Sequence, residues 1–264
     1  MKSIIQSQIT AECPWRDTLY WYGCLDSTNN RAKVLAKDGA PAGTVVIAGM
    51  QTHGRGRLGR SFSSPEGQGV YLSVILRPKC MPDRLMHLTC AAGVAACKAV
   101  QKAVGICPNI KWANDLVWQK KKLGGILTEL GFDPATGAVD YAIVGIGINC
   151  MQTDFPAELQ SIATSLFQVT QKPCPTDTLT ASLIEAMWEL DRQLLDGKAE
   201  LMTEYGRLCM TIGQDVVVVQ GEQKQYAKAL YVDDDGGLCV QYADGTQAVV
   251  SFGEVSVRGM YGYL

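Results

Sequence analysis

The segment of residues 51–60, Gln-Thr-His-Gly-Arg-Gly-Arg-Leu-Gly-Arg, combines positive charge with backbone freedom. Three arginines, Arg55, Arg57 and Arg60, alternate here with three glycines. Glycine lets the main chain approach a ligand closely, and arginine donates paired hydrogen bonds to carboxylate or phosphate. The pattern indicates a loop that orders around an anion, while a solvated hairpin tip explains the same composition. It is neither a Walker A loop nor a dinucleotide fingerprint, because the flanking residues do not predict strand–turn–helix.

A second cluster of charge follows at residues 111–122. Its Asn114-Asp115 pair is typical of a turn, and the lysine run 120–122 is typical of an exposed hairpin. The apolar segment 125–130 that follows predicts a buried strand. Such a strand would hold Lys122 at its N-terminal end, where a single ammonium group can point towards a substrate.

Two glycines, Gly145 and Gly147, interrupt the apolar segment 141–148. Glycine inside an apolar strand often marks a close approach of backbone or ligand. Packing of a helix against the strand explains these glycines equally well.

Periodicity predicts the elements that must carry these residues. Strands are expected over residues 20–25, 44–48, 70–76, 116–119, 125–130 and 141–148, with helices between the polar cap 26–30 and Gly39, over 83–104 and over 178–195. The pattern of predicted elements changes near Met210, from alternating helices and strands to short strands separated by turns. These strands are expected over residues 216–219, 224–232, 238–242, 247–250 and 254–258. Five short strands in about 55 residues indicate a small barrel of SH3-like size. We therefore expect two domains, residues 1–210 and 211–264.

Composition excludes several classes of protein. The chain has 264 residues with 24 Lys plus Arg and 26 Asp plus Glu, a net charge of −2, which disfavours a basic coat for nucleic acid. The 10 cysteines form no C-x-x-C pair, so no zinc or redox signature is present. No signal peptide and no apolar run of about 18 residues is found, which predicts a cytoplasmic protein without a membrane span. His53 is expected in solvent, and His87 on the polar side of the long helix.

Six segments, in this order, together resemble the motifs of biotin–protein ligases, also called biotin–[acetyl-CoA-carboxylase] ligases. They are residues 26–29 (DSTN), 51–60 (QTHGRGRLGR), 111–116 (KWANDL), 122–127 (KLGGIL), 145–149 (GIGIN) and 254–258 (EVSVR). Each segment alone is weak evidence for this resemblance, but the six segments in order span about residues 20 to 260. The resemblance implies an α+β fold in which a class II synthetase-like mixed sheet flanked by helices precedes the small SH3-like barrel.

The resemblance also implies a two-step carbon–nitrogen ligase. Biotin and Mg·ATP would give biotinyl-5′-AMP and pyrophosphate, and the acyl group would then pass to a lysine of a biotin carboxyl carrier domain. Biotin is then a substrate, ATP with Mg²⁺ is the co-substrate, and no tightly bound prosthetic group is expected. The first step joins two anions that repel each other, so cations must neutralise both and hold them in line.

Roles for individual residues follow from the same resemblance. Ser27, Thr28 and Gln51 are expected to hydrogen-bond the ureido ring of biotin, beside a wall that Asn29 helps to form. Further residues are expected to bind the aliphatic tail of biotin, the phosphate or the nucleotide. They are Arg55, Gly56, Arg57, Lys122, Gly125, Gly145, Gly147, Asn149 and Arg258. Arg55, Arg57 and Lys122 would be the catalytic cations. Asp115 is expected either to help hold Mg²⁺ or to orient an arginine, and Ser27 can also serve as a helix N-cap.

Departures from the family pattern are small. Phe62 stands where the family often has Trp, which keeps an aromatic lid without an indole donor, and Ala113 stands where it often has Pro. Some members carry an N-terminal winged-helix repressor domain, for which about 19 residues before the first strand are too few, so no specific DNA binding is expected. Dimerisation through a sheet edge is compatible with the fold.

Two other functions remain open from the residues alone. A lipoate or octanoate ligase shares the broad fold. The dithiolane ring of lipoate, however, needs no wall of hydrogen-bond donors such as Ser27, Thr28 and Gln51. A phosphate- or nucleic-acid-binding module would bind phosphates through the Arg-Gly loop, the loop that contains residues 51–60. However, this loop lacks interleaved aromatic residues, and the net charge of the chain is near zero.

Overall fold

The structure, a computed structural model, describes residues 1–251 and the backbone of residues 256–259. Its strands are β1 (Leu19–Leu25), β2 (Val45–Gln51), β3 (Gly69–Leu76), β4 (Asn109–Lys111), β5 (Asp115–Trp118), β6 (Lys121–Phe132), β7 (Val139–Asn149), β8 (Asp215–Gln220), β9 (Gln223–Val232), β10 (Leu238–Tyr242), β11 (Gln247–Val250) and β12 (Ser256–Gly259). Its α-helices are α1 (Lys2–Gln8), α2 (Thr28–Lys37), α3 (Leu88–Val104), α4 (Leu166–Thr170), α5 (Thr176–Gln193) and α6 (Lys198–Leu208).

The first seven strands form one mixed sheet in the order β1-β2-β3-β7-β6-β5-β4. β1 and β2 are parallel, and the remaining neighbours are antiparallel. The central strand β7 is apolar over residues 141–148, as expected for a strand with helices packed against both of its faces. The expected mixed sheet flanked by helices is therefore confirmed.

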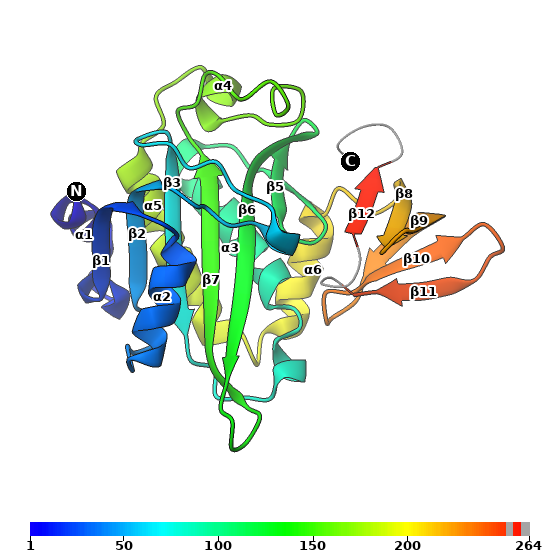
Figure 1. The fold of residues 1–264 in the computed structure, drawn as a ribbon, viewed down its shortest axis with the longest axis horizontal. Helices are drawn as coiled ribbons and strands as arrows, with labels where there is room; N and C mark the ends of the chain where they lie inside the picture. Colours follow the sequence, from blue (N-terminus) through cyan, green and yellow to red (C-terminus); the bar gives the residue numbers. More distant parts are fainter. Residues whose placement is uncertain (252–255, 260–264) are drawn as a thin grey trace.

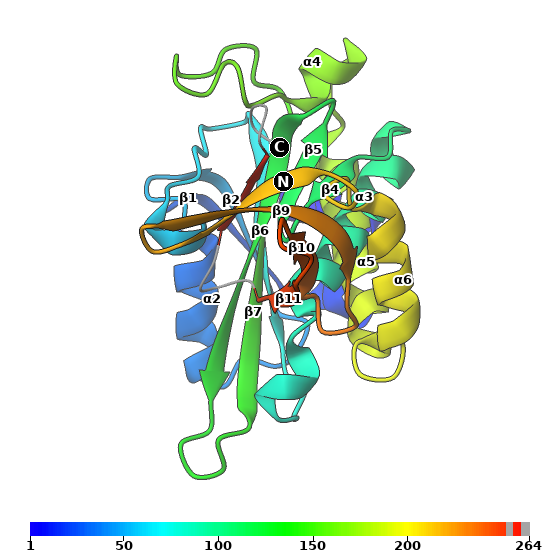
Figure 2. The same cartoon turned by 90° about the vertical axis from the view of Figure 1, so that its right-hand side faces the viewer.

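Helices cover the two faces of this sheet unequally (Figures 1 and 2). α2 covers one face, where Ala32 and Ala36 pack against Val46, Ile75 and Ile143. α3, α5 and α6 lie on the other face, over the larger core. The small side chains of α3 allow it to approach the sheet closely, and twelve of its residues are buried.

The C-terminal strands form a second, antiparallel sheet in the order β11-β10-β9-β8-β12. The turn between β9 and β10 reaches back to the large sheet. The indole nitrogen of Trp112, between β4 and β5, donates to the carbonyl oxygen of Gly236 at 2.8 Å. Lys198, at the start of α6, forms an ion pair with Asp235. The strand predicted over residues 254–258 falls partly outside the described residues, and only Ser256 onward is seen in β12.

Each predicted strand within the described residues matches an observed strand to within about four residues at its ends. The strand β4 was missed, and three helices were not predicted. These are α1, α4 and α6. The helix predicted over residues 83–104 starts only at Leu88, since Pro82–Leu85 forms a separate 3-10 turn. No helix in the part of the chain that the structure describes is long and apolar enough to cross a membrane.

The prediction that His87 lies on the polar side of the long helix is wrong. Its side chain is fully buried at the N-cap of α3, where Nε2 lies 2.8 Å from the carbonyl oxygen of Leu194. A carbonyl only accepts, so Nε2 carries the proton and Nδ1 is the bare ring nitrogen. Nδ1 is buried and has no hydrogen-bond partner among the described residues. Burial lowers the pKa of His87, although the bond to Leu194 opposes the shift.

We predict that acidification destabilises the protein through His87. Below its usual pKa of 6.5 the unfolded chain binds a proton that the folded chain resists, so the free energy of unfolding falls as the pH drops from 7 towards 5. The loss is at most about 1.4 kcal/mol per pH unit. Urea unfolding at several pH values measures it. His87→Gln, whose amide can still donate to Leu194, should flatten this pH dependence, whereas the exposed His53→Gln should not. Equal slopes in all three proteins would contradict the assignment.

Candidate functional site

A cavity of about 300 Å³ opens beside the central strands of the large sheet, beneath the Arg-Gly loop. The start of α2, the loop 51–63, the strands β6 and β7 and the segment 155–163 line it. All predicted site residues except Arg258 line this cavity: Ser27, Thr28, Asn29, Gln51, Arg55, Gly56, Arg57, Asp115, Lys122, Gly125, Gly145, Gly147 and Asn149. Arg258 lies on β12, and its side chain falls outside the described residues.

Neutral hydrogen-bonding groups form one end of the cavity. The backbone nitrogen of Thr28 donates to Gln51 Oε1 at 2.8 Å, and Gln51 Nε2 donates to Ser64 Oγ at 2.8 Å. These two bonds fix the orientation of the Gln51 amide, because only its oxygen can accept and only its nitrogen can donate. Gln51 and Ser64 also form a backbone bridge that closes the base of the loop.

The N-terminus of α2 contributes the adjoining wall. Ser27 occupies the N-cap position, but its side chain makes no capping hydrogen bond. The hydroxyl of this buried residue therefore does not perform the structural task that the sequence allowed. Next to it, Asn29 Oδ1 accepts from Ser73 Oγ at 2.6 Å, and Ser73 Oγ lies 2.8 Å from Thr28 Oγ1. A serine from β3 thus ties the two α2 residues to the sheet.

Both glycines of β7 make room for side chains. A Cβ on Gly145 would lie 2.0 Å from Asn29 Oδ1, and a Cβ on Gly147 would lie 2.6 Å from the ring of Phe62. On β6, a Cβ on Gly125 would lie 3.4 Å from its nearest neighbours, an ordinary contact. Gly145 and Gly147 therefore border the cavity, and their open faces are occupied by Asn29 and by Phe62 of the loop.

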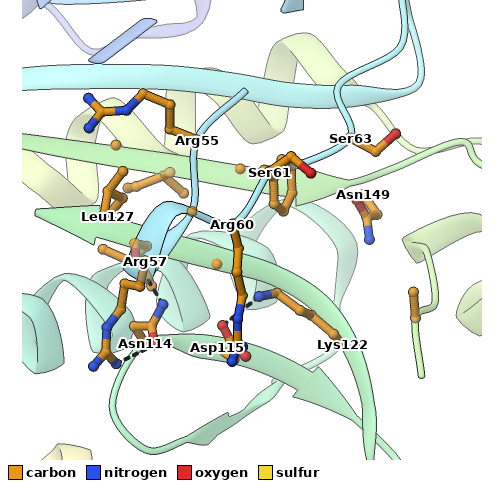
Figure 3. Close-up of a pocket in the computed structure, with 18 of the residues that line it drawn as sticks. Arg55, Arg57, Arg60, Ser61, Ser63, Asn114, Asp115, Lys122, Leu127 and Asn149 are labelled. Atoms are coloured by element: carbon orange, nitrogen blue, oxygen red, sulfur yellow. Dashed lines mark hydrogen bonds and ion pairs between the residues drawn. The ribbon is translucent and has the colours of Figure 1, made fainter. Parts of the chain in front are cut away.

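Cations gather at the other end of the cavity (Figure 3). Lys122 Nζ forms an ion pair with Asp115 Oδ1 at 2.7 Å, and Arg57 Nη1 donates to Asn114 Oδ1 at 2.9 Å. Asn114 in turn bonds both backbone groups of Ile126, which fixes β5 against β6. Burial lowers the pKa of the Arg57 guanidinium, and the charge of Asp115 opposes that shift.

Arg55 does not join the other two predicted catalytic cations. Its side chain points away from Lys122 in Figure 3, and its Nη1 lies 2.9 Å from Glu129 Oε2. The same nitrogen donates to Asn30 Oδ1 at 3.0 Å. Glu129 was missed in the sequence, although an acidic residue inside the apolar strand 125–130 was a signal that could have found it.

The remaining predicted nucleotide residue, Asn149, lies at the end of β7. It is buried, and its Nδ2 donates to the carbonyl oxygen of Thr164 at 3.0 Å. The segment before Thr164 also pairs with Lys122, through backbone bonds between Lys122 N and Ile162 O at 2.7 Å and between Thr164 N and Lys122 O at 2.8 Å. This segment therefore fixes the backbone of the lysine that stands at the cationic end.

The lining of the cavity supplies few potential ligands for a metal ion. No group of three or more His, Cys, Asp or Glu side chains in the described part of the chain could hold a metal ion together. Asp115 is a carboxylate at the cationic end, and it is already paired with Lys122. Mg²⁺ commonly binds through one or two carboxylates, substrate phosphates and water, so Asp115 fits a single ligand position.

Taken together, the cavity suits an elongated molecule with a neutral polar group at one end and an anion at the other. Amide and hydroxyl groups of Gln51, Thr28 and Ser27 face the first, and Arg57 and Lys122 face the second. A second anion brought to the same cations would be held against the first.

Comparison with known proteins gives two family matches. Residues 21–149 match the model of the biotin/lipoate A/B protein ligase family, and residues 211–258 match that of the biotin protein ligase C-terminal domain. The chain is 35% identical over 236 residues to the bifunctional ligase/repressor BirA of Bacillus subtilis (strain 168), covering 88% of this chain and 72% of that protein. It is 32% identical to the biotin–[acetyl-CoA-carboxylase] ligase of Mycobacterium tuberculosis, covering 87% of this chain and 85% of that protein.

The fold is also similar to solved structures. The biotin protein ligase from Aquifex aeolicus in complex with biotin and ATP superposes with a TM-score of 0.79 at 31% identity. The match covers 92% of this chain and 99% of that chain. The similarity therefore extends over both sheets.

We predict that Gly145→Ala damages the site and that Gly125→Ala is tolerated by the fold. A methyl group on Gly145 would collide with Asn29, whereas one on Gly125 would make ordinary contacts. Overpacking of this kind costs typically about 1 to 3 kcal/mol of stability. Chemical denaturation of the two variants measures the difference. A Gly145→Ala protein as stable as wild type would show that Asn29 does not need this close approach.

Proposed function

The chain belongs to the biotin/lipoate A/B protein ligase family, and from this premise we propose that it is an ATP-dependent biotin–protein ligase. It activates biotin as biotinyl-5′-AMP and transfers the acyl group to a lysine of a biotin carboxyl carrier domain. The observation that supports the proposal is the polarity of the cavity, with neutral donors and acceptors at one end and Arg57 and Lys122 at the other. Biotin has a neutral ureido ring at one end and a carboxylate at the other.

In the first step a carboxylate oxygen of biotin attacks the α-phosphorus of ATP. The bond from that phosphorus to the bridging oxygen breaks, and pyrophosphate leaves. Carboxylate and phosphate repel each other, so the residues that neutralise both charges lower the barrier most. Lys122 and Arg57 are proposed for this role. Asp115 is the residue proposed to contribute one ligand to a Mg²⁺ ion, which would supply further charge neutralisation at the ATP phosphates, or to orient a cation.

In the second step the ε-amine of the carrier lysine attacks the carbonyl carbon of the adenylate. AMP leaves with the electrons of the carbon–oxygen bond, and the amine loses a proton. The mixed anhydride must be protected from water until the carrier arrives. The Arg-Gly loop can provide this cover, because Phe62 of the loop already contacts Gly147 within the cavity.

Finer assignments belong to the same proposal. Ser27, Thr28 and Gln51 bind the ureido ring beside Asn29, while Gly56, Gly125, Gly145 and Gly147 border the aliphatic tail. Asn149 and Arg258 serve the nucleotide. We place the catalytic domain at residues 1–210 and the C-terminal domain at residues 211–264. The family matches at 21–149 and 211–258 and the separate second sheet support this division.

We predict that purified protein releases pyrophosphate from Mg·ATP only when biotin is added, and that Lys122→Ala lowers this rate by roughly 100- to 1,000-fold. Because Lys122 meets the reacting anions rather than the ureido ring, biotin affinity should fall far less. A coupled pyrophosphate assay and calorimetry with biotin measure the two effects. Lys121→Ala is the matched control, since Lys121 is exposed and adjacent.

Two outcomes would contradict this assignment. No biotin-dependent release from wild-type protein would reject the ligase function. Equal losses of rate and of biotin affinity in Lys122→Ala would make Lys122 a binding residue rather than a catalytic one.

A further inference from the structure

Glu129 lies where three separate parts of the chain meet. Its carboxylate accepts hydrogen bonds from Asn29 Nδ2 at 2.9 Å and from Lys33 Nζ at 2.8 Å, both on α2. It also accepts from Arg55 Nη1 of the Arg-Gly loop, at 2.9 and 3.0 Å to its two oxygens. One side chain of β6 thus holds both the helix that forms the cavity wall and the loop that covers it.

The Glu129 side chain is only 17% exposed, so its charge is partly withdrawn from water. Burial opposes its ionisation, but the hydrogen bonds from Lys33 and Asn29 and the charge of Arg55 more than compensate and lower the pKa of Glu129. An ionised carboxylate accepts hydrogen bonds about twice as strong as those between neutral groups. Losing this charge would therefore weaken all three contacts together.

The contacts of Glu129 continue as a chain of hydrogen bonds under the cavity. Asn29, held by Glu129 through Nδ2, contacts Ser73 through Oδ1, and Ser73 contacts Thr28. Thr28 in turn holds Gln51. These hydrogen bonds therefore connect Glu129 to the side-chain amide of Gln51 at the neutral end of the cavity. Arg55, on the other side of Glu129, lies within the loop that Gln51 and Ser64 close, and it forms a second backbone bridge there with Ser61.

We propose that Glu129 is a positioning residue for the acid substrate: its carboxylate anchors Arg55 and Asn29 and thereby sets the affinity of the site for biotin. The proposal rests on the ligase function above. Glu129 is not among the residues that line the cavity, so it acts through its partners. The cationic end with Lys122 and Arg57 is held by Asp115 and Asn114 instead, which makes ATP binding independent of Glu129.

Lys33 provides a matched control. It pairs with the same carboxylate, but it does not line the cavity and contacts neither the loop nor Gln51 in any bond described for it. Lys33→Gln removes an ion pair from Glu129 while leaving Arg55 and Asn29 in place. An effect of Glu129 that is merely structural would be shared by the two variants.

The experiment measures the Kd for biotin by calorimetry without ATP, and the KM for ATP by pyrophosphate release, on the full-length chain. For Glu129→Gln we expect biotin binding to weaken about tenfold to a hundredfold, the range of a lost hydrogen bond to a charged group. The KM for ATP should change less than about twofold. Lys33→Gln should change both values less than about threefold.

A double variant tests whether the effect passes through the loop. In an Arg55→Gln background, Glu129→Gln should cost less in biotin affinity than it does alone, because one of its partners is already gone. Full additivity, or a parallel loss of ATP affinity, would overturn the proposal. Should Glu129→Gln fail to fold, Glu129→Asp keeps the charge but shortens the reach, and we expect it to weaken biotin binding selectively.

Biotin binding by the wild-type protein separates failure of the ligase function from failure of the Glu129 role. A wild-type protein that does not bind biotin rejects the ligase function itself. A wild-type protein that binds biotin, with a Glu129→Gln protein that binds it equally well, rejects only the role of Glu129.

Discussion

The contact of α2 with the sheet at Gly145 is the constraint on which the site depends. Asn29 fills the space that a side chain on Gly145 would need, and this close approach brings the helix N-terminus down to the strands. From there Asn29 reaches Glu129 on β6 and Ser73 on β3, so a single amide joins three elements. The neutral end of the cavity is built on this junction. A bulkier residue at position 145 would separate the helix from the hydrogen-bond chain that orients Gln51.

Three positive charges of the site are divided between two tasks. Arg55 is committed to Glu129, whereas Arg57 and Lys122 lie at the cationic end beside Asn114 and Asp115. Under the proposed function, the same loop is therefore a structural anchor through Arg55 and supplies a cation to the reacting groups through Arg57. This division also explains why a net charge of −2 says little about function, since the charges that matter are concentrated in one cavity.

Much of this arrangement could be predicted from the sequence, and the failures have physical causes. Strands such as β3 and β10 follow from short runs of apolar and β-branched residues between turn residues, and the ordered motifs predicted which residues share a cavity. His87 and Glu129 were misjudged or missed because their partners, Leu194 and Arg55, lie 107 and 74 residues away along the chain. Sequence polarity predicts exposure, but a buried hydrogen bond or ion pair reverses that expectation. The start of α3 was placed too early because a 3-10 turn has helical composition without α-helical hydrogen bonds.

The most direct test asks which acid the protein activates. The purified chain is incubated with Mg·ATP and equal concentrations of biotin and lipoate, the reaction is quenched, and the adenylates are identified by mass spectrometry. A site that recognises a neutral polar ring through Ser27, Thr28 and Gln51 predicts biotinyl-5′-AMP with little or no lipoyl-AMP. Predominant lipoyl-AMP, or no adenylate from either acid, would contradict the account.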